Sequence, residues 1–481
     1  MNENKKRSLI TMIALLFIVF FRFIPAPVGL SVSAMQVIGT FIGVLILWLT
    51  IAIDWPSLLC LLALSFIPEI KVNTLLAGSI GSSTFAFLLF TFMCTYAISK
   101  TSFVRRCALF FINSKIAQRG PWSFAISFFM SVIFLGMFMS PTVLFVIYLP
   151  ILEEIYKVTK LQKTNSFANM LMIGMTLSIA ISSGMTPIAH VFSIMAIGFY
   201  EAATNLTISY FQYMSFAIPV GLLTFSGMLV TFRFILKPKT SVFNVKDANI
   251  QYESLPAMDK TELLTLIIFS VVILLWIAPS LLEGLMPELA NYINSFGTAV
   301  PPLLGAVAML MIHIDGKPLL VFNEAMTKGI SWAALIMTAS TLALGSALTN
   351  GDIGIATWLT NTVGPTLQNL DPLYLIIIFT LWPAIQTNLS SNMVTVTVVS
   401  AVALPIALTI SDKLNPAAIA CIIGLMASFS FATPPAHPNV ALAASSGWTS
   451  TKQMMMYGFM IMIIAVIITI MIGYPLANLL I

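Results

Sequence analysis

Two short segments of the sequence place threonine, proline and histidine in the same order. They are TPIAH at 186–190 and TPPAH at 433–437. Proline removes a backbone donor and disturbs the preceding helical turn, so each segment should interrupt a helix and free carbonyls that can bind a cation. Histidine titrates near neutral pH, so His190 and His437 are candidates for charge coupling or for donating to an anion. The residues expected at the binding site are Thr186, Pro187, Thr433 and Pro434.

A second pair of polar clusters interrupts apolar sequence ahead of each pentapeptide. Ser140 and Thr142 lie in MFMSPTVLF, and Ser391 and Asn392 lie in QTNLSSNMVTVT. A half-helix that begins at such a cluster presents unpaired amides and a positive dipole end, which suit an anion. At any one position the alternative is a tolerated kink whose hydroxyls bond back to the helix. Repetition of the pattern in both halves favours a binding site.

The composition indicates that lipid surrounds the elements carrying these residues. The chain has 481 residues, of which 59% are hydrophobic and 8% are charged, whereas soluble domains have about 25% charged residues. We expect an all-α multi-pass membrane protein with eleven spans and two further apolar segments, 121–151 and 372–411. The net charge of +5 does not indicate a nucleic-acid partner, because the basic residues lie in loops. The expected spans are 8–26, 35–53, 55–69, 76–99, 165–195, 211–235, 261–282, 298–313, 330–350, 414–445 and 454–480.

The basic residues predict how the chain crosses the membrane. With the N-terminus in the cytoplasm, 19 of the 22 lysine and arginine residues, including those between Arg233 and Lys260, fall on the cytoplasmic side. Segment 121–151 has a basic loop on each flank, so it should enter the membrane and turn back as a re-entrant hairpin. Segment 372–411 should do the same from the opposite face. Irregular backbone at membrane depth survives only inside protein or beside a polar cavity, so the hairpins indicate a central site.

The order of elements repeats along the chain. Each half contains a polar hairpin, a loop and a span broken at Thr-Pro, within a set of five spans. Because five is odd, the second set should be inserted upside down relative to the first. Inverted repeats with discontinuous helices that meet at the midplane are typical of secondary transporters.

The quoted segments resemble the divalent anion:sodium symporters, which carry dicarboxylates, citrate or sulfate. The segment ATPPAHPNVALA is similar to a break in that family, SSNMVTVTVVSAVALPIA is similar to its second hairpin, and PAPVGLSVSAMQVIGTFIGVLILWLTIAIDWPSLLCLLALSFIP is similar to its first three spans. The resemblance implies two sodium sites and a homodimer whose transport domain slides like an elevator against a scaffold. The implied scaffold parts are 1–119 and 237–370, and the implied transport parts are 120–236 and 371–481.

Carried over position by position, the resemblance implies one well-kept half-site and one altered half-site. In the altered half Ser140, Thr142 and Thr186 match, but Pro141 replaces an asparagine and Met185 stands where glycine is expected. In the kept half Ser391 and Asn392 match the hairpin motif, whose threonine is replaced by methionine. The implied cation ligands there are Thr387, Ser390, Asn392 and Ala432. Spacing to the following proline would instead equate Thr395 and Thr397 with the first hairpin tip, so two registers stay open.

These patterns predict a secondary active transporter of small divalent organic anions. A dicarboxylate such as succinate or malate fits best, with citrate or sulfate as further candidates, moved by cation-coupled symport or by exchange. We expect sodium at the second half-site only, or a histidine proton in its place, and no other cofactor. A passive anion channel is the alternative, although no filter-like repeat supports it. An enzyme is not expected, because no nucleophile and base pair and no ATP-binding motif occur. The expected location is the plasma membrane.

Overall fold

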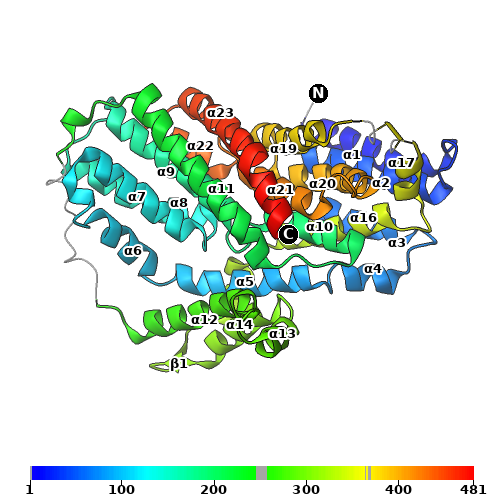
Figure 1. The fold of residues 1–481 in the computed structure, drawn as a ribbon, viewed down its shortest axis with the longest axis horizontal. Coiled ribbons are helices and arrows are strands. Elements are labelled where there is room, and N and C mark those ends of the chain that lie inside the picture. Colours follow the sequence, from blue (N-terminus) through cyan, green and yellow to red (C-terminus); the bar gives the residue numbers. More distant parts are fainter. Residues whose placement is uncertain (1–2, 245–256, 363–364, 367–369) are drawn as a thin grey trace.

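The computed structural model describes residues 3–244, 257–362, 365–366 and 370–481. The prediction of an all-α protein is confirmed, since these residues are nearly all helical, with one two-stranded ribbon (Figure 1). Lys246, in a predicted basic loop, lies outside the described residues. The elements before the first hairpin are α1 (Glu3–Phe20), η1 (Phe21–Phe23), α2 (Val32–Thr50), α3 (Trp55–Ser65), α4 (Val72–Gly78), α5 (Ser83–Ser99), α6 (Phe103–Ile112) and η2 (Ala117–Arg119).

Both predicted hairpins are pairs of helices separated by a short break. The first pair is α7 (Pro121–Gly136) and α8 (Pro141–Val158), and the second is α19 (Pro372–Leu389) and α20 (Asn392–Thr409). Proline occupies the first turn of α7, α8 and α19, where its missing amide hydrogen costs no intrahelical bond. Each hairpin tip is therefore a short segment at which one helix ends and the next helix begins.

Both Thr-Pro segments interrupt helices as expected. The predicted span 165–195 is divided into α9 (Ser166–Met185) and α10 (Val191–Thr204), and the predicted span 414–445 into α21 (Pro416–Ser428) and α22 (Pro438–Ser445). Because α10 runs beyond the predicted span, it also contains Glu201. The residues between the helices, 186–190 and 429–437, are named the first break and the second break.

The remaining elements complete the two halves of the chain. After α10 come α11 (Tyr210–Thr231), the π-turn η3 (Phe232–Leu236) and η4 (Thr240–Val242). The middle of the chain holds α12 (Lys260–Leu282), α13 (Pro287–Asn294), α14 (Val300–Met311), β1 (His313–Ile314), β2 (Lys317–Pro318), α15 (Phe322–Glu324), η7 (Ala325–Gly329), α16 (Trp332–Thr349) and α17 (Ile355–Thr362). The chain ends with α23 (Thr451–Ile468), η8 (Thr469–Gly473) and α24 (Tyr474–Leu480).

Among the described residues, eight helical stretches are long and apolar enough to cross a bilayer. The predicted span 76–99 is not one straight helix, because α4 and α5 meet at a 40° bend, and counting this pair gives nine. Two of these nine are the hairpin helices α19 and α20, which the prediction of eleven spans does not include. The predicted eleven also contain the shorter apolar helices α3, α14 and α21 and helix α1, whose N-terminal turns are charged. The chain is an integral multi-pass membrane protein. Some of its helices are shorter than the predicted spans, and some predicted spans are interrupted.

The second half of the chain packs into the first at the breaks. Helix α10 lies against α16, α20 and α21, while α9 lies against α7, α8 and α21. In Figure 1, α10, α20 and α21 lie between α7–α9 on the left and α2, α3 and α16 on the right. Helix α22 contacts both α8 and α9, as α10 contacts α20 and α21. The helix that follows each break therefore contacts the hairpin of the other half.

Candidate functional site

The second hairpin and the second break are joined by the amide of Asn388, a fully buried residue. Its Oδ1 accepts the backbone amides of Phe431 at 2.7 Å and Ala432 at 2.9 Å. Its Nδ2 donates to the carbonyls of Phe429 at 2.9 Å and Ala384 at 2.8 Å. Unpaired backbone groups are costly away from water, so this one side chain satisfies much of the irregular backbone of the second break.

Next to this amide, the hydroxyl oxygen of Thr387 lies close to two other oxygen atoms. Its Oγ1 lies 2.8 Å from Asn392 Oδ1 and 2.7 Å from the carbonyl oxygen of Ala427. The nitrogen of Asn392 donates to Ser430 Oγ at 2.9 Å. The Thr387 hydroxyl has a single hydrogen for two acceptors. A cluster of oxygens with so few hydrogens is suited to a hard cation.

In the first half, only the threonine of the break makes a hydrogen bond to the hairpin that matches one in the second half. The hydroxyl of Thr186 donates to the carbonyl of Met137, as Thr433 donates to the carbonyl of Asn388 at 2.7 Å. Methionine at 137 has no amide with which to hold the first break. Instead the Tyr213 hydroxyl reaches the Gly184 carbonyl at 2.7 Å, at the end of α9. One carbonyl that could have served a cation is therefore already hydrogen-bonded.

The sequence left two registers open for the second hairpin tip, and the helix starts offer one way to align the two tips. Ser140 and Ser391 are both N-cap residues, and the helices that follow both have 18 residues. This alignment equates Pro141 with Asn392. Thr395 and Thr397 lie inside α20, where they donate to the carbonyls of Ser391 at 3.0 Å and Met393 at 2.9 Å. The spacing from the hairpin tip to the following proline differs because Pro150 and Pro405 lie at different turns of α8 and α20.

At both tips the serine leaves the first-turn amides uncapped. Neither Ser140 nor Ser391 caps its helix with its side chain. Of the other N-cap serines, Ser82, Ser209 and Ser450 each accept a backbone amide at the starts of α5, α11 and α23. Ser102 and Ser331, at the starts of α6 and α16, make no such bond. Serine at an N-cap normally satisfies one of the orphan donors there. The two hairpin tips therefore keep donors that an anion can use.

The two halves meet through α22 and the two histidines. Asn439 donates to the Pro141 carbonyl at 3.0 Å, which joins the start of α22 to the start of α8. The rings of His190 and His437 have centroids 6.1 Å apart. His437 Nδ1 accepts the Asn439 amide at 3.2 Å, so this nitrogen carries no proton and the imidazole is neutral. The helix starts of α8, α10 and α22 thus converge.

The polar residues expected at one cavity occupy several places in this conformation. Ser140 is exposed and lines a cavity of about 240 Å³ beside Tyr96 and Lys328. Thr186 lines a different, apolar cavity of about 370 Å³. Asn392 and Thr433 line neither of these two cavities.

The other predicted residues are placed as follows. Thr142 is exposed, Pro187 is buried, and Pro434 is partly buried. Ser390 donates to Gln386 O at 2.9 Å within its own helix, and the amide of Ala432 faces Asn388. The polar groups that meet around Thr387 are therefore Asn392 and the Ala427 carbonyl, not Ser390.

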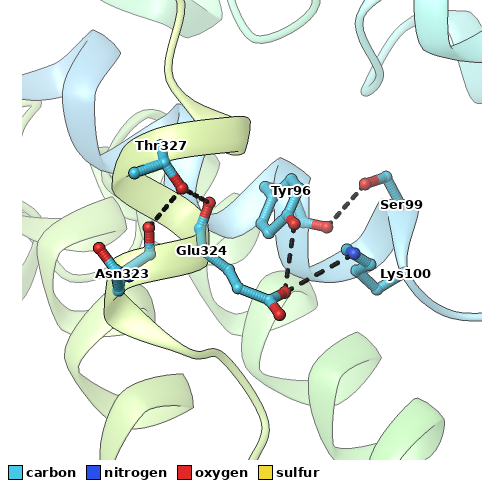
Figure 2. A network of polar contacts seen from close by, with 6 residues as sticks. All are labelled: Tyr96, Ser99, Lys100, Asn323, Glu324 and Thr327. Atoms are coloured by element: carbon cyan, nitrogen blue, oxygen red, sulfur yellow. Dashed lines mark hydrogen bonds and ion pairs between the residues drawn. The ribbon is translucent and has the colours of Figure 1, made fainter.

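One polar network fixes the wall of the cavity that contains Ser140. Figure 2 shows the carboxylate of Glu324 turned toward Tyr96 and Lys100 at the end of α5. Glu324 Oε2 lies 3.4 Å from the Tyr96 hydroxyl and 3.7 Å from Lys100 Nζ. These contacts hold α15 against α5 on the face that the basic loops predict to be cytoplasmic. Lys328, on the adjoining η7, lines the cavity and gives it a positive charge.

Sequence reasoning missed the residues that organise the breaks, namely Asn388, Ser430, Asn439 and Tyr213. Asn388 lies in the quoted QTNLSSNMVTVT segment, three residues before the N-cap Ser391 and ahead of the Ser-Asn motif. Asn439 lies within the quoted ATPPAHPNVALA, two residues after His437. A buried asparagine beside a helix break was the available signal, since such a residue needs several hydrogen-bond partners.

Comparison with known proteins decides the family. The family described as "Sodium:sulfate symporter transmembrane region" matches residues 3–481, almost the whole chain. The chain belongs to the sodium:sulfate symporter family. It is therefore a secondary transporter of anions and not an enzyme.

Several proteins are similar to this transporter in sequence or structure. The sodium-dependent dicarboxylate transporter SdcS of Staphylococcus aureus is 24% identical over 481 residues, covering 96% of this chain and 88% of that protein. An uncharacterized transporter of Haemophilus influenzae is 25% identical over 72% of this chain and 71% of its own length. The crystal structure of the Alcanivorax borkumensis YdaH transporter, 12% identical, matches with a TM-score of 0.50 over 85% of this chain and 86% of that chain. The last likeness shows a shared fold.

Proposed function

We propose that this transporter moves small dicarboxylates, such as succinate or malate, by alternating access, and that a cation drives the movement. The observation that carries the proposal is the pair of uncapped helix starts at Ser140 and Ser391. Together they offer first-turn amides and hydroxyls to a dianion, and Lys328 adds a positive charge to the cavity that contains Ser140. The printed name of the similar SdcS protein, a sodium-dependent dicarboxylate transporter, supports the same substrate class.

Sodium is the proposed coupling ion, and it binds only in the second half. The hydroxyl oxygen of Thr387 lies within hydrogen-bond distance of Asn392 Oδ1 and of the Ala427 carbonyl oxygen, and it carries the single hydrogen of the three atoms. In the first half, Pro141 stands in place of Asn392 and Met137 in place of Asn388, so the matching side-chain oxygens are missing. The neutral state of His437 in this arrangement agrees with coupling to sodium rather than to a histidine proton.

The movement that exposes the site to each side is proposed to occur between two groups of elements. The hairpins and breaks, within 120–236 and 371–481, form the moving group, and 1–119 with 237–370 form the scaffold of a homodimer. Close packing of α9 on α7 and of α21 on α19 and α20 supports the first group as a unit. The proposed location is the plasma membrane with the N-terminus in the cytoplasm, as the distribution of basic loops predicts.

Uptake into proteoliposomes tests the function. A sodium gradient should drive labelled succinate to a concentration inside that exceeds the one outside, which a passive channel cannot achieve. Asn392→Ala should lower the initial rate by on the order of ten- to a hundredfold, because a hydrogen bond to a charged partner is worth about 1.5–3 kcal/mol.

Asn323→Ala is the matched control, since this side chain is exposed and lies outside both breaks. It should leave the uptake rate unchanged. Full uptake by a folded Asn392→Ala protein would remove this residue from the site. Equilibration without accumulation would show that the chain is a channel for this solute.

A further inference from the structure

An apolar cavity of about 370 Å³ lies between α11 and α12 and reaches the first hairpin tip at Met137. Two hydroxyls belong to its wall, and both are already used. Thr186 donates to the Met137 carbonyl, and Ser215 donates to the carbonyl of Phe211 at 2.7 Å. An anion would find no side-chain donor here, so the cavity does not fit the transported solute. An apolar cavity of about 150 Å³ holds a benzene molecule, so this cavity has room for a longer hydrocarbon segment.

The two helices that wall the cavity, α11 and α12, also carry exposed apolar side chains. Its α11 wall includes Phe211, Ser215 and Ile218, and helical spacing continues this face to Leu222, which is 40% exposed. Helix α12 is the least buried of the eight candidate spans, with 28% of its apolar window buried. Its other face carries Leu274, which is 61% exposed. A lipid chain lying along α11 can therefore enter from the side.

A second, polar cavity of about 360 Å³ adjoins the first, and Trp276 lines both. The polar cavity is built from the ends of α5, α10 and α12 and from the loop before α14, all predicted to lie on the outer face. Trp276 donates to the Thr298 carbonyl at 3.0 Å. Tryptophan is enriched where the hydrocarbon of a membrane meets water. The junction of the two cavities thus lies at the depth of a lipid headgroup.

The polar cavity has a chemical preference of its own. Its lining contains one carboxylate, Glu201, and no lysine, arginine or histidine. Hydroxyl and amide groups from Ser209, Gln212 and Asn294 complete the wall. A cationic group that donates hydrogen bonds complements this lining, whereas a headgroup with only negative charge does not.

We propose that the two cavities are the tail part and the headgroup part of one site for a membrane phospholipid with an aminoalkyl headgroup. The amine contacts Glu201, the headgroup passes Trp276, and an acyl chain fills the apolar cavity down to Met137. Because the tail touches α12 on one side and the first break and hairpin tip on the other, it fills the space across which these elements face each other.

Photolabelling in liposomes tests the tail. The probe is a phosphatidylethanolamine with a diazirine in its acyl chain, and labelled positions are mapped by mass spectrometry. Ile273 and Ile277 mark the cavity face of α12, while Leu274 and Leu281 mark the bilayer face. We expect both faces to be labelled in the unmodified protein. Labelling confined to Leu274 and Leu281 would overturn the proposal without any variant being needed.

A cavity-filling variant distinguishes labelling by lipid bound in the cavity from labelling by lipid of the surrounding bilayer. Ser215→Phe should reduce labelling of the cavity face at least fivefold and leave the bilayer face unchanged. Ser226→Phe is the matched control, because Ser226 also bonds the carbonyl four residues earlier on α11, at 2.8 Å, but is exposed. It should change neither face. Undiminished labelling of Ile273 and Ile277 in a monodisperse Ser215→Phe protein would overturn the proposal.

The headgroup is tested by changing only the lipid. A phosphatidylglycerol probe with the same diazirine tail should label the cavity face several-fold less than the ethanolamine probe. Glu201→Gln should bring the two probes close to equal labelling. Equal labelling in the unmodified protein, or a preference that survives Glu201→Gln, would overturn the assignment of Glu201 to the headgroup.

Discussion

At the scale of single residues, the two halves differ at the position three before the N-cap residues Ser140 and Ser391 of the hairpin helices. Asn388 occupies it in the second half and Met137 in the first. Asn388 holds two amides and one carbonyl from 429–432, whereas only the backbone carbonyl of Met137 is used. An asparagine offers two donors and an acceptor that methionine cannot supply. The second break is therefore held by side-chain chemistry that the first break lacks.

Replacing Asn388 by alanine should destabilise the protein and abolish uptake. The amides of Phe431 and Ala432 and the carbonyl of Phe429 would be left buried without partners, and each such group costs about 1–3 kcal/mol. Thermal unfolding in detergent should show a clear fall in the midpoint temperature. Thr380→Val is the control, since Thr380 is equally buried on α19 but bonds only one carbonyl within the helix, that of Ile376 at 2.7 Å. If both variants unfold at the same temperature, Asn388 does not hold the break.

At the scale of elements, α23 presses its backbone against the second break. A Cβ added at Gly458 would lie 2.5 Å from the Cα of Ala432 and 2.6 Å from the carbonyl oxygen of Phe431. Both are backbone atoms, which cannot move aside as a flexible side chain would. Glycine at this position lets α23 cover the irregular segment closely enough to exclude lipid from it.

Gly458→Ala should therefore separate α23 from the second break and lower both stability and uptake. Overpacking of this kind costs about 1–3 kcal/mol. Gly78→Ala is the matched control, because Gly78 ends a helix and a Cβ there meets nothing within 4 Å. Its unfolding temperature should stay the same or rise. An unchanged unfolding temperature in Gly458→Ala would mean that α23 can move away from the second break without loss of stability.

At the scale of the whole molecule, the hairpin tips should be reached from opposite sides of the membrane. Ser140 lines a cavity with Lys328 and Ser99, on the predicted cytoplasmic side. Leu389, at the second tip, is 57% exposed. In a protein whose four native cysteines are replaced by serine, Ser140→Cys should react with an impermeant maleimide from inside and Leu389→Cys from outside. Reaction of both from one side in every condition would exclude the inverted repeat.

The unequal halves also predict the dependence of transport on sodium. Initial uptake measured against sodium concentration should follow a Hill coefficient near one, because only the second half gathers unprotonated oxygens around Thr387. Thr387→Val should raise the sodium concentration needed for half-maximal uptake. A coefficient clearly above one that persists in His190→Gln and His437→Gln would show that a second cation binds at the first break.

The sequence by itself determined the class of the protein and the places where its helices break. A polar cluster or Thr-Pro pair can be a tolerated kink at any one position, but recurrence in both halves favours interruptions, which survive at membrane depth only inside protein or beside a polar cavity. The breaks at 186–190 and 429–437 and both hairpins could be predicted for that reason. So could their repetition in the two halves, and the resemblance in these same segments identified the family.

The tertiary structure alone decided which groups meet across the breaks. Spacing to a proline could not choose between Ser391 and Thr395, because proline is tolerated at more than one turn, whereas the helix start depends on where the chain turns back. The partners of Asn388 in the second break lie 41 to 44 residues away, and Asn439 meets Pro141 across 298 residues. Hydrogen bonds between residues so far apart in the sequence depend on how the two halves pack, and the local sequence pattern does not reveal that packing.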